Sequence, residues 1–394
     1  MASNIIYITR DIERAMGKAP IGNYFIITNS NPYSIEIKNK FPENIFLIDS
    51  SEILDTYELL KLDEVKTIIS KLNAQILVFK NTIAIENICK ENNWTLLNPS
   101  AETAEKVENK ISQISWLNEL ADLLPPHSIS KTKDIEWKDK AFIIQWSHGH
   151  TGDGTLLIQN EKDLNILKDK FPQREAKVVE FIKGPIFTLN IVVTRTDIIL
   201  GNISYQITGM LPFTENPFST IGNDWSIPHT ILTDANINKI EEISKKIGEK
   251  MKTNNWKGLF GIDLIYNEEK DLIHLIEINA RQPASTTYES ELQSYINMHG
   301  VSGITTFDAH ISSLIGQQIN SKLIPINDGA QILQRVTKNA HKLDPIKLIK
   351  AGYKIIIYNN TKNNEDLIRI QSLLGIMESH NKFNKRGKEI LELI

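Results

Sequence analysis

Asp263, Glu277 and Asn279 are the residues of this sequence whose types and spacing point most directly to chemistry. They lie in two apolar runs, Leu259–Tyr266 and Leu272–Ile278, which are separated by a polar turn. That pattern predicts a β-hairpin. Two carboxylates and an amide in an apolar hairpin are costly unless a cation lies between them. Hard oxygen ligands of this kind suit Mg²⁺, which shares its remaining positions with water and substrate phosphates.

The register of the hairpin decides whether these three side chains can meet. We expect Tyr266 to pair with Leu272 across the turn. Asp263 would then lie opposite Leu275, and side-chain alternation would put all three polar side chains on one face. Arg281 follows two residues after the hairpin and suits a carboxylate or phosphoryl group.

The pattern G-x-D followed by E-x-N-x-R resembles the metal-binding hairpin of the ATP-grasp superfamily. This superfamily includes biotin carboxylase, carbamoyl-phosphate synthetase and D-alanine–D-alanine ligase. The resemblance implies a fold of the α/β (α+β) class, ATP as the nucleotide, and Mg²⁺ or Mn²⁺ held by Asp263, Glu277 and Asn279. The alternative is a hairpin whose acidic side chains point to solvent.

A lysine upstream of the hairpin lies between two helical stretches. Ser100 begins the sequence S-A-E-T, which indicates a helix start, and Lys110 follows the first helix. The segment resembles biotin carboxylase, in which an A-E-T helix precedes a lysine that contacts the ATP phosphates. The resemblance assigns Lys110 to this contact, and the alternative is a solvated helix lysine.

A glycine-rich loop follows an apolar strand that begins near residue 141. Glycines let backbone N–H groups approach phosphate oxygens closely, and successive N–H groups form an anion-binding concavity. In this position the loop resembles the glycine-rich lid of the ATP-grasp fold. The nucleotide contacts that the resemblance implies are Gln145, Ser147, Gly149, Gly152, Gly154 and Thr155. Families such as biotin carboxylase have a lysine where Gln145 stands, so this contact is expected to be weaker, although glutamine still donates hydrogen bonds.

Two histidines in the same loop, His148 and His150, raise the question of a zinc site. Their spacing, without a cysteine or a third nearby histidine, fits zinc poorly. A contact with substrate or phosphate is the favoured interpretation.

The sequence K-V-V-E-F-I-K-G-P resembles the strand and hinge that hold adenine in ATP-grasp proteins. The resemblance implies that the backbone near Phe181 and Ile182 meets the base edge and that Glu180 lies beside the nucleotide. An exposed strand end is the alternative for Glu180. In D-alanine–D-alanine ligase an acidic residue after the proline binds ribose, but here that residue is Ile186.

The rest of the chain divides around this segment. Residues 1–105 alternate strand and helix patterns, which predicts an open, mostly parallel sheet. Together with the resemblance, this predicts an N-terminal α/β domain over 1–105 and an ATP-grasp domain over 106–318. A lid subdomain is expected at about 138–205 and a small C-terminal domain over 319–394, with a helix over 364–374.

A proline- and glycine-rich stretch over residues 206–230 shows little periodicity and predicts a long loop. Loops of this length within a compact domain are usually functional. We expect a flap that faces the substrate, with Asp224, Trp225 and His229 as possible contacts. A surface excursion without function is the alternative.

Composition sets limits on the class of protein. The net charge of −4 gives no reason to expect nucleic acid or an anionic membrane as the main partner. The single cysteine, Cys89, excludes an internal disulfide and fits a reducing compartment. No signal peptide and no membrane-spanning run is evident, so a cytoplasmic location is expected.

The resemblance implies an ADP-forming ligase that activates a carboxylate as an acyl phosphate for attack by an amine. Arg281 and Lys110 would be the catalytic residues, since neutralising the charge on the transferring phosphoryl group is the main physical need. An amino-acid or peptide ligase with small-molecule substrates is favoured, and a homodimer is a family-level expectation. A non-catalytic ATP-binding module and a kinase or carbamoyl-phosphate-type enzyme are the alternatives.

Overall fold

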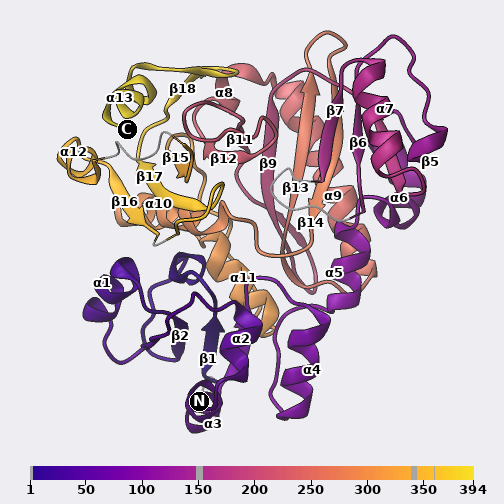
Figure 1. The fold of residues 1–394 in the computed structure, drawn as a ribbon. Coiled ribbons are helices and arrows are strands. Elements are labelled where there is room, and N and C mark those ends of the chain that lie inside the picture. The colour runs from indigo at the N-terminus through magenta and orange to yellow at the C-terminus, as the bar shows by residue number, and fades with distance from the viewer. Residues whose placement is uncertain (1–2, 148–153, 339–343, 359) are drawn as a thin grey trace.

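The computed structural model describes residues 3–147, 154–338, 344–358 and 360–394. Its first unit is a parallel sheet with the strand order β3-β2-β1-β4, as the alternating pattern predicted. The strands are β1 (Ile5–Ile8), β2 (Tyr24–Asn29), β3 (Ile45–Ile48) and β4 (Gln75–Val78). The helices are α1 (Pro32–Lys40), α2 (Thr56–Lys61), α3 (Asp63–Leu72) and α4 (Ile83–Glu91). Figure 1 shows this unit below the rest of the molecule.

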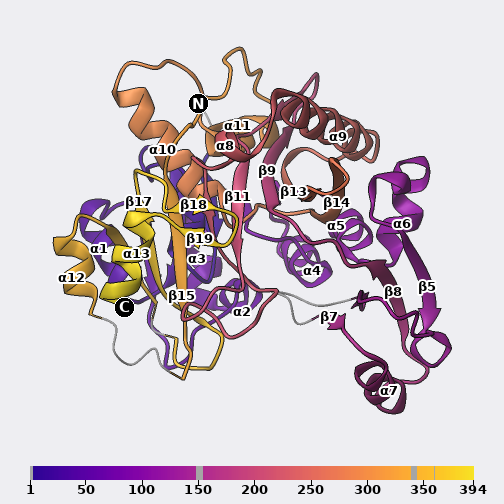
Figure 2. The ribbon, with the colours of Figure 1, turned by 90° about the horizontal axis from the view of Figure 1, so that it is seen from above.

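A second, antiparallel sheet has the order β5-β8-β6-β7. Its strands are β5 (His127–Lys131), β6 (Phe142–Gln145), β7 (Thr155–Ile158) and β8 (Glu175–Glu180). Helix α7 (Glu161–Lys170) covers one face, where Leu164 belongs to an apolar cluster with Ile144 and Ala176. Figure 2 shows this sheet and α7 standing beside the large sheet. Helices α5 (Ala101–Glu108) and α6 (Ser112–Leu117) precede it in the chain.

Within the described residues, nine strands form the large sheet, in the order β14-β13-β9-β11-β12-β15-β17-β16 with β10 paired to β9. Strands of its first half are β9 (Ile186–Val193), β10 (Ile198–Leu200), β11 (Ser204–Thr208), β12 (Thr220–Asp224), β13 (Gly258–Asn267) and β14 (Leu272–Asn279). The second half is β15 (Ala330–Arg335), β16 (Lys354–Ile357) and β17 (Asp366–Ser372). The main apolar core joins this sheet to helix α9 (Asp234–Thr253), through residues such as Ile243, Phe260 and Ile262. Asp263 therefore points to the opposite face of β13.

Five further α-helices lie within the described residues (Figure 1). They are α8 (Pro228–Ile231), α10 (Thr286–Met298), α11 (Thr306–Leu314), α12 (Pro345–Lys350) and α13 (Lys385–Leu393), with a small ribbon of β18 (Met377–Ser379) and β19 (Lys382–Phe383). No helix within the described ranges is both long and apolar enough to cross a membrane. The division into three domains stays a prediction, and strands β15, β16 and β17 of the tail continue the large sheet.

The helix predicted over 364–374 is wrong, because this segment forms strand β17. Ile368 and Ile370 belong to the main apolar core. Arg369 and Gln371 occupy the alternate positions and are buried as well, and Arg369 donates a hydrogen bond to the Gln331 side chain. Apolar and polar side chains alternate with a period of two residues here, which is a strand pattern. The sequence does not show that the polar side chains are buried too, so the strand was not predicted.

The long loop predicted over 206–230 is wrong in part, because strands β11 and β12 pair as a hairpin there and only residues 209–219 between them form a loop. Asp224 is fully buried and accepts backbone hydrogen bonds from Ile376 and Met377 at 2.6 and 2.9 Å. Trp225 is fully buried in a small apolar cluster with Tyr288. These two side chains therefore hold the fold together and are not substrate contacts.

Candidate functional site

The expected register of the metal hairpin is wrong at the turn. Asn267 pairs with Leu272, where Tyr266 was expected to do so. The turn is tighter because the Asn267 side chain accepts a hydrogen bond from the backbone of Lys270, at 3.2 Å. Asp271 completes the turn with a φ of 51°, a conformation that Asp and Asn tolerate better than most residues.

A β-bulge restores the arrangement that the chemistry needs. Ile276 has no partner in the ladder, and beyond it Asp263 pairs directly with Glu277, and Gly261 with Asn279. With the observed turn and no extra residue, Glu277 would lie on the opposite face from Asp263. The predicted grouping of the three side chains on one face is therefore correct, but it arises through the bulge.

Asp263 lies in a buried, polar pocket on strand β13. Its carboxylate accepts a hydrogen bond from the Thr188 hydroxyl at 2.7 Å and one from the Asn279 amide at 3.2 Å. Burial, and next the charge of Glu277, raises the pKa of Asp263 to about 6. A cation beside Asp263 would therefore stabilise the ionised form of its carboxyl group. Sequence reasoning missed Thr188, whose signal is a polar residue within the apolar strand β9.

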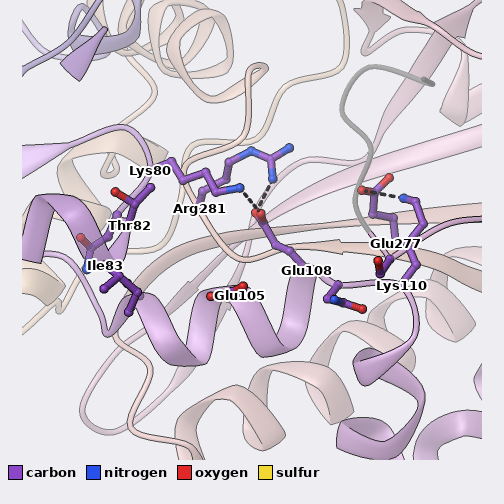
Figure 3. Close-up of a pocket in the computed structure, with 12 residues that line it drawn as sticks. Lys80, Thr82, Ile83, Glu105, Glu108, Lys110, Glu277 and Arg281 are labelled. Carbon is purple, nitrogen blue, oxygen red and sulfur yellow. Dashed lines mark hydrogen bonds and ion pairs between the residues drawn. The ribbon is translucent and has the colours of Figure 1, made fainter. Parts of the chain in front are cut away.

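Lys110 lies between α5 and α6, as predicted, and it is buried, with a residue exposure of 7%. Its Nζ lies 3.2 Å from Oε1 of Glu277, and Figure 3 shows the two side chains pointing toward each other. The alternative of a solvated helix lysine is therefore wrong. An ammonium group is thus fixed beside the paired carboxylates.

Arg281 is held between the hairpin and helix α5. One guanidinium nitrogen donates to Oδ1 of Asn279 at 2.7 Å, and another donates to Glu108. Lys80 reaches the same Glu108 carboxylate at 2.6 Å, so both cations converge on it, as Figure 3 shows. Sequence reasoning missed Lys80 and Glu108, although Glu108 ends the helix that precedes Lys110.

Two adjoining cavities, of about 340 and 210 Å³, meet at these residues. Lys110, Glu277 and Arg281 line both of them. The larger cavity is also lined by residues of β9, β11, β12, β15 and β17 of the large sheet and by Gln145 of the small sheet. The cleft therefore lies between the two sheets.

The predicted nucleotide residues of the glycine-rich loop are distributed along this cleft. Gln145, Gly154 and Thr155 line the larger cavity, and Ser147 lines the smaller one. Gly149, Gly152, His148 and His150 lie outside the described residues. A nucleotide role for the loop stays a prediction, with four of its residues placed at the cleft.

Glu180 ends strand β8 and forms ion pairs with two lysines. Its Oε1 lies 2.7 Å from Lys140 and 3.5 Å from Lys270. The hydrogen bond from Lys140 lowers the pKa of Glu180 below its ordinary value. These contacts tie the small sheet to the turn of the hairpin, and a place beside the nucleotide stays a prediction.

Phe181 and Ile182 lie in the segment between β8 and β9, where an adenine hinge was predicted. The same segment passes close to β13, since a Cβ added at Gly184 would lie 1.9 Å from the carbonyl oxygen of Tyr266. Glycine is required there by this contact. Ile186, which replaces the expected acidic residue, lines the larger cavity. The adenine and ribose contacts stay predictions.

The oxygen donors of the hairpin fit a hard divalent cation. Two carboxylates and one amide supply part of a coordination sphere, and Mg²⁺ usually takes its other ligands from water and phosphate oxygens. The described residues contain no group of three or more histidine, cysteine, aspartate or glutamate side chains that could hold a metal ion. Asp263, Glu277 and Asn279 would leave positions on a bound ion for water and phosphate oxygens.

The fold and the cleft define a protein that can hold a phosphate chain between a small antiparallel sheet and a larger one. Residues 107–285 match a family described as the ATP-grasp domain. This segment is an ATP-grasp domain, and it contains both Lys110 and the hairpin. The predicted superfamily is thereby confirmed, and ATP binding is assigned to this domain. A comparison with curated protein sequences gives no match.

Solved structures with the same fold cover nearly the whole chain. N5-carboxyaminoimidazole synthetase from Staphylococcus aureus, complexed with ADP, has a TM-score of 0.68 at 14% identity, covering 100% of this chain and 97% of its own. N5-carboxyaminoimidazole synthase from Aspergillus clavatus, with ADP and 5-aminoimidazole ribonucleotide, has a TM-score of 0.68 at 13% identity, covering 99% of each chain. L-amino acid ligase from Bacillus licheniformis has a TM-score of 0.64 at 12% identity, covering 99% and 96%.

These likenesses confirm the predicted fold class, an α/β fold of the ATP-grasp type. The predicted class of activity, ADP-forming ligation, agrees with the match to the ATP-grasp domain.

Proposed function

We propose that this protein is an ATP-dependent ligase that activates a small carboxylate as an acyl phosphate and joins it to an amine. The observation that carries the proposal is the pairing of the buried Asp263 with Glu277, beside the buried Lys110, within an ATP-grasp domain. A carboxylate oxygen of the substrate attacks the γ-phosphorus of ATP, and ADP leaves. The amine then attacks the carbonyl carbon, phosphate leaves, and the amine gives up a proton.

The side chains of the hairpin would neutralise charge during the first step. Asp263, Glu277 and Asn279 would hold Mg²⁺ or Mn²⁺, which supplies charge neutralisation to the phosphates when it is bound. Lys110 supplies a fixed positive charge that needs no reorganisation, because Glu277 already holds its ammonium in place. Arg281 is oriented by Glu108 and would bind the substrate carboxylate or stabilise the acyl phosphate.

The end of the larger cavity near the N-terminal unit is suited to the acid. Arg14, Ser285, Arg335 and Arg369 line it. Arg335 and Arg369 are occupied by the protein, since both lie within 4 Å of the Asp366 carboxylate. Nη1 of Arg14 is buried without a hydrogen-bond partner within the described part of the chain. We assign Arg14, through this Nη1, and Arg281 to the substrate carboxylate, although each also forms an ion pair within the protein, Arg14 with Glu13 at 3.3 Å and Arg281 with Glu108.

Three measurements separate the ligase from its alternatives. The purified protein is incubated with Mg-ATP and pools of carboxylates and amines, and ADP and phosphate are measured. A ligase releases ADP and phosphate only when both pools are present. A kinase needs one pool and releases no phosphate, and a binding module shows a thermal shift with Mg-ATP but no turnover.

Three finer points belong to the same proposal. We propose the three-domain division at about residues 105 and 318, a cytoplasmic location, and a homodimer. Light scattering of the purified protein tests the dimer, because a monomeric mass would exclude it.

A further inference from the structure

Lys177 is a buried lysine for which the proposed mechanism has no use. It lies on strand β8 with 1% of its surface exposed, and it is among the largest fully buried side chains. Within the described residues its ammonium group has no hydrogen bond and no ion pair, and its Nζ is not among the fully enclosed side-chain atoms that lack a partner, so the atom keeps a small accessible surface. A buried ammonium without a partner destabilises a fold, and this cost calls for a compensating anion.

The position of Lys177 points to the phosphate region of the cleft. It pairs directly with Gln145 of β6, so both side chains lie on the face that is not covered by α7. Gln145 lines the larger cavity. Burial, and next the charge of Lys110, lowers the pKa of Lys177 to about 8, whereas Glu277 acts in the opposite direction. Lys177 therefore lies near Lys110 and Glu277, the two charged residues that line both cavities.

We propose that Lys177 binds the phosphate chain of the nucleotide and supplies, from strand β8, the positive charge that Gln145 does not supply from β6. This inference rests on the proposed function, because it requires ATP in the cleft. Directly paired residues on neighbouring strands have Cβ atoms about 5 Å apart, so a lysine on either strand reaches the same volume. Gln145 remains beside it as a neutral hydrogen-bond donor.

A lysine that binds a ligand and a lysine that stabilises the fold respond differently when a neutral side chain replaces them. Lys177→Met retains the length and the apolar stem but removes the charge. Without nucleotide we expect this variant to unfold at a higher temperature, because an unpaired buried charge is gone. With nucleotide we expect weaker binding of ADP, by about 10- to 100-fold, the range of one charge-assisted hydrogen bond. A lysine that serves the fold would give a lower unfolding temperature.

Titration calorimetry with Mg-ADP and with adenosine, which lacks phosphates, tests the proposal. Lys177→Met and Lys177→Gln should weaken ADP binding and leave adenosine binding unchanged. The double variant Gln145→Lys with Lys177→Gln should recover ADP binding, since it returns the charge from the neighbouring strand. Lys133→Gln removes an exposed lysine that immediately follows β5 of the same sheet and should behave as the wild type.

Each other outcome overturns the inference. ADP binding within about twofold of the wild type in both single variants shows that Lys177 does not touch phosphate. Equal losses for ADP and adenosine, or a double variant as weak as Lys177→Gln, show a structural role. If Lys177→Met does not fold, the ADP affinities of Lys177→Gln and of the double variant test the proposal in its place. A wild-type protein that binds no ADP refutes the proposed function itself, which is a distinguishable result.

Discussion

The two carboxylates of the hairpin should give opposite changes in stability when each is neutralised. Glu277→Gln removes the ion-pair partner of the buried Lys110. Breaking a buried pair costs several kcal/mol, but the Glu277 side chain is 35% exposed, so we expect the free energy of unfolding to fall by about 1–2 kcal/mol.

Asp263→Asn relieves a buried charge. A pKa raised from 3.8 to about 6 by burial and by Glu277 corresponds to an unfavourable contribution of ~3 kcal/mol at neutral pH. Asparagine can still accept the hydrogen bond from Thr188 but loses the one from Asn279, which costs about 1 kcal/mol. We therefore expect the metal-free protein to gain about 2 kcal/mol in stability.

Urea denaturation at pH 7.5 with a chelator measures both changes. Both variants should also lose Mg-dependent turnover, by at least about 100-fold, because each lacks one negative ligand. Glu269→Gln, in the exposed turn of the same hairpin, is the control and should change stability by less than about 0.5 kcal/mol. If Asp263→Asn destabilises the protein as much as Glu277→Gln, Asp263 is a structural acceptor. If Glu277→Gln retains turnover, the metal assignment is wrong.

Three further predictions concern the elements around the site. Burial lowers the pKa of His310 from 6.5 to about 3, and its neutral ring accepts the backbone hydrogen bond of Leu259 at 2.9 Å. As the pH falls below 6.5, this histidine takes up a proton in the unfolded chain but not in the folded one, so the free energy of unfolding falls. Urea denaturation should give a value ~2 kcal/mol lower at pH 5 than at pH 7.5, and His310→Asn should not show this difference. Deletion of Ile276 should leave the affinity for ADP within about tenfold of the wild type, because this bulge residue has no ladder partner and β14 is an edge strand. Deletion of Ile278, which has a ladder partner, should abolish ADP binding. Arg281→Lys should raise the KM for the carboxylate by about tenfold or more without changing ADP affinity, as initial rates and calorimetry would show; equal changes in both would contradict the assignment.

Local patterns predicted the N-terminal sheet and the helices around Lys110 because each of these elements is short-range. Alternating strand and helix patterns and helix caps such as Ser100 are properties of neighbouring residues. The failures have a different origin. The segment over 364–374 carries buried polar residues that only the contacts across the sheet explain, such as the bond from Arg369 to Gln331 at 3.1 Å. Asp224 is buried for a partly similar reason, since its Oδ1 accepts from the nearby Ser226 and Ile227 but its Oδ2 accepts from Ile376 and Met377 at the far end of the chain.

The metal hairpin shows the same limit within the site itself. The sequence spacing of Asp263, Glu277 and Asn279 is compatible with a shared face in more than one register, and a bulge at Ile276 selects the one that occurs. Likewise, Lys177 reads as one more lysine at a strand end until the register places it opposite Gln145. A motif indicates which residues contact a ligand, but strand pairing determines which side chains lie close enough to share that contact. Because directly paired side chains lie on one face about 5 Å apart, a long charged side chain from either strand can reach the same part of the cleft, and a comparison of motifs along the chain would record such an exchange as a lost contact.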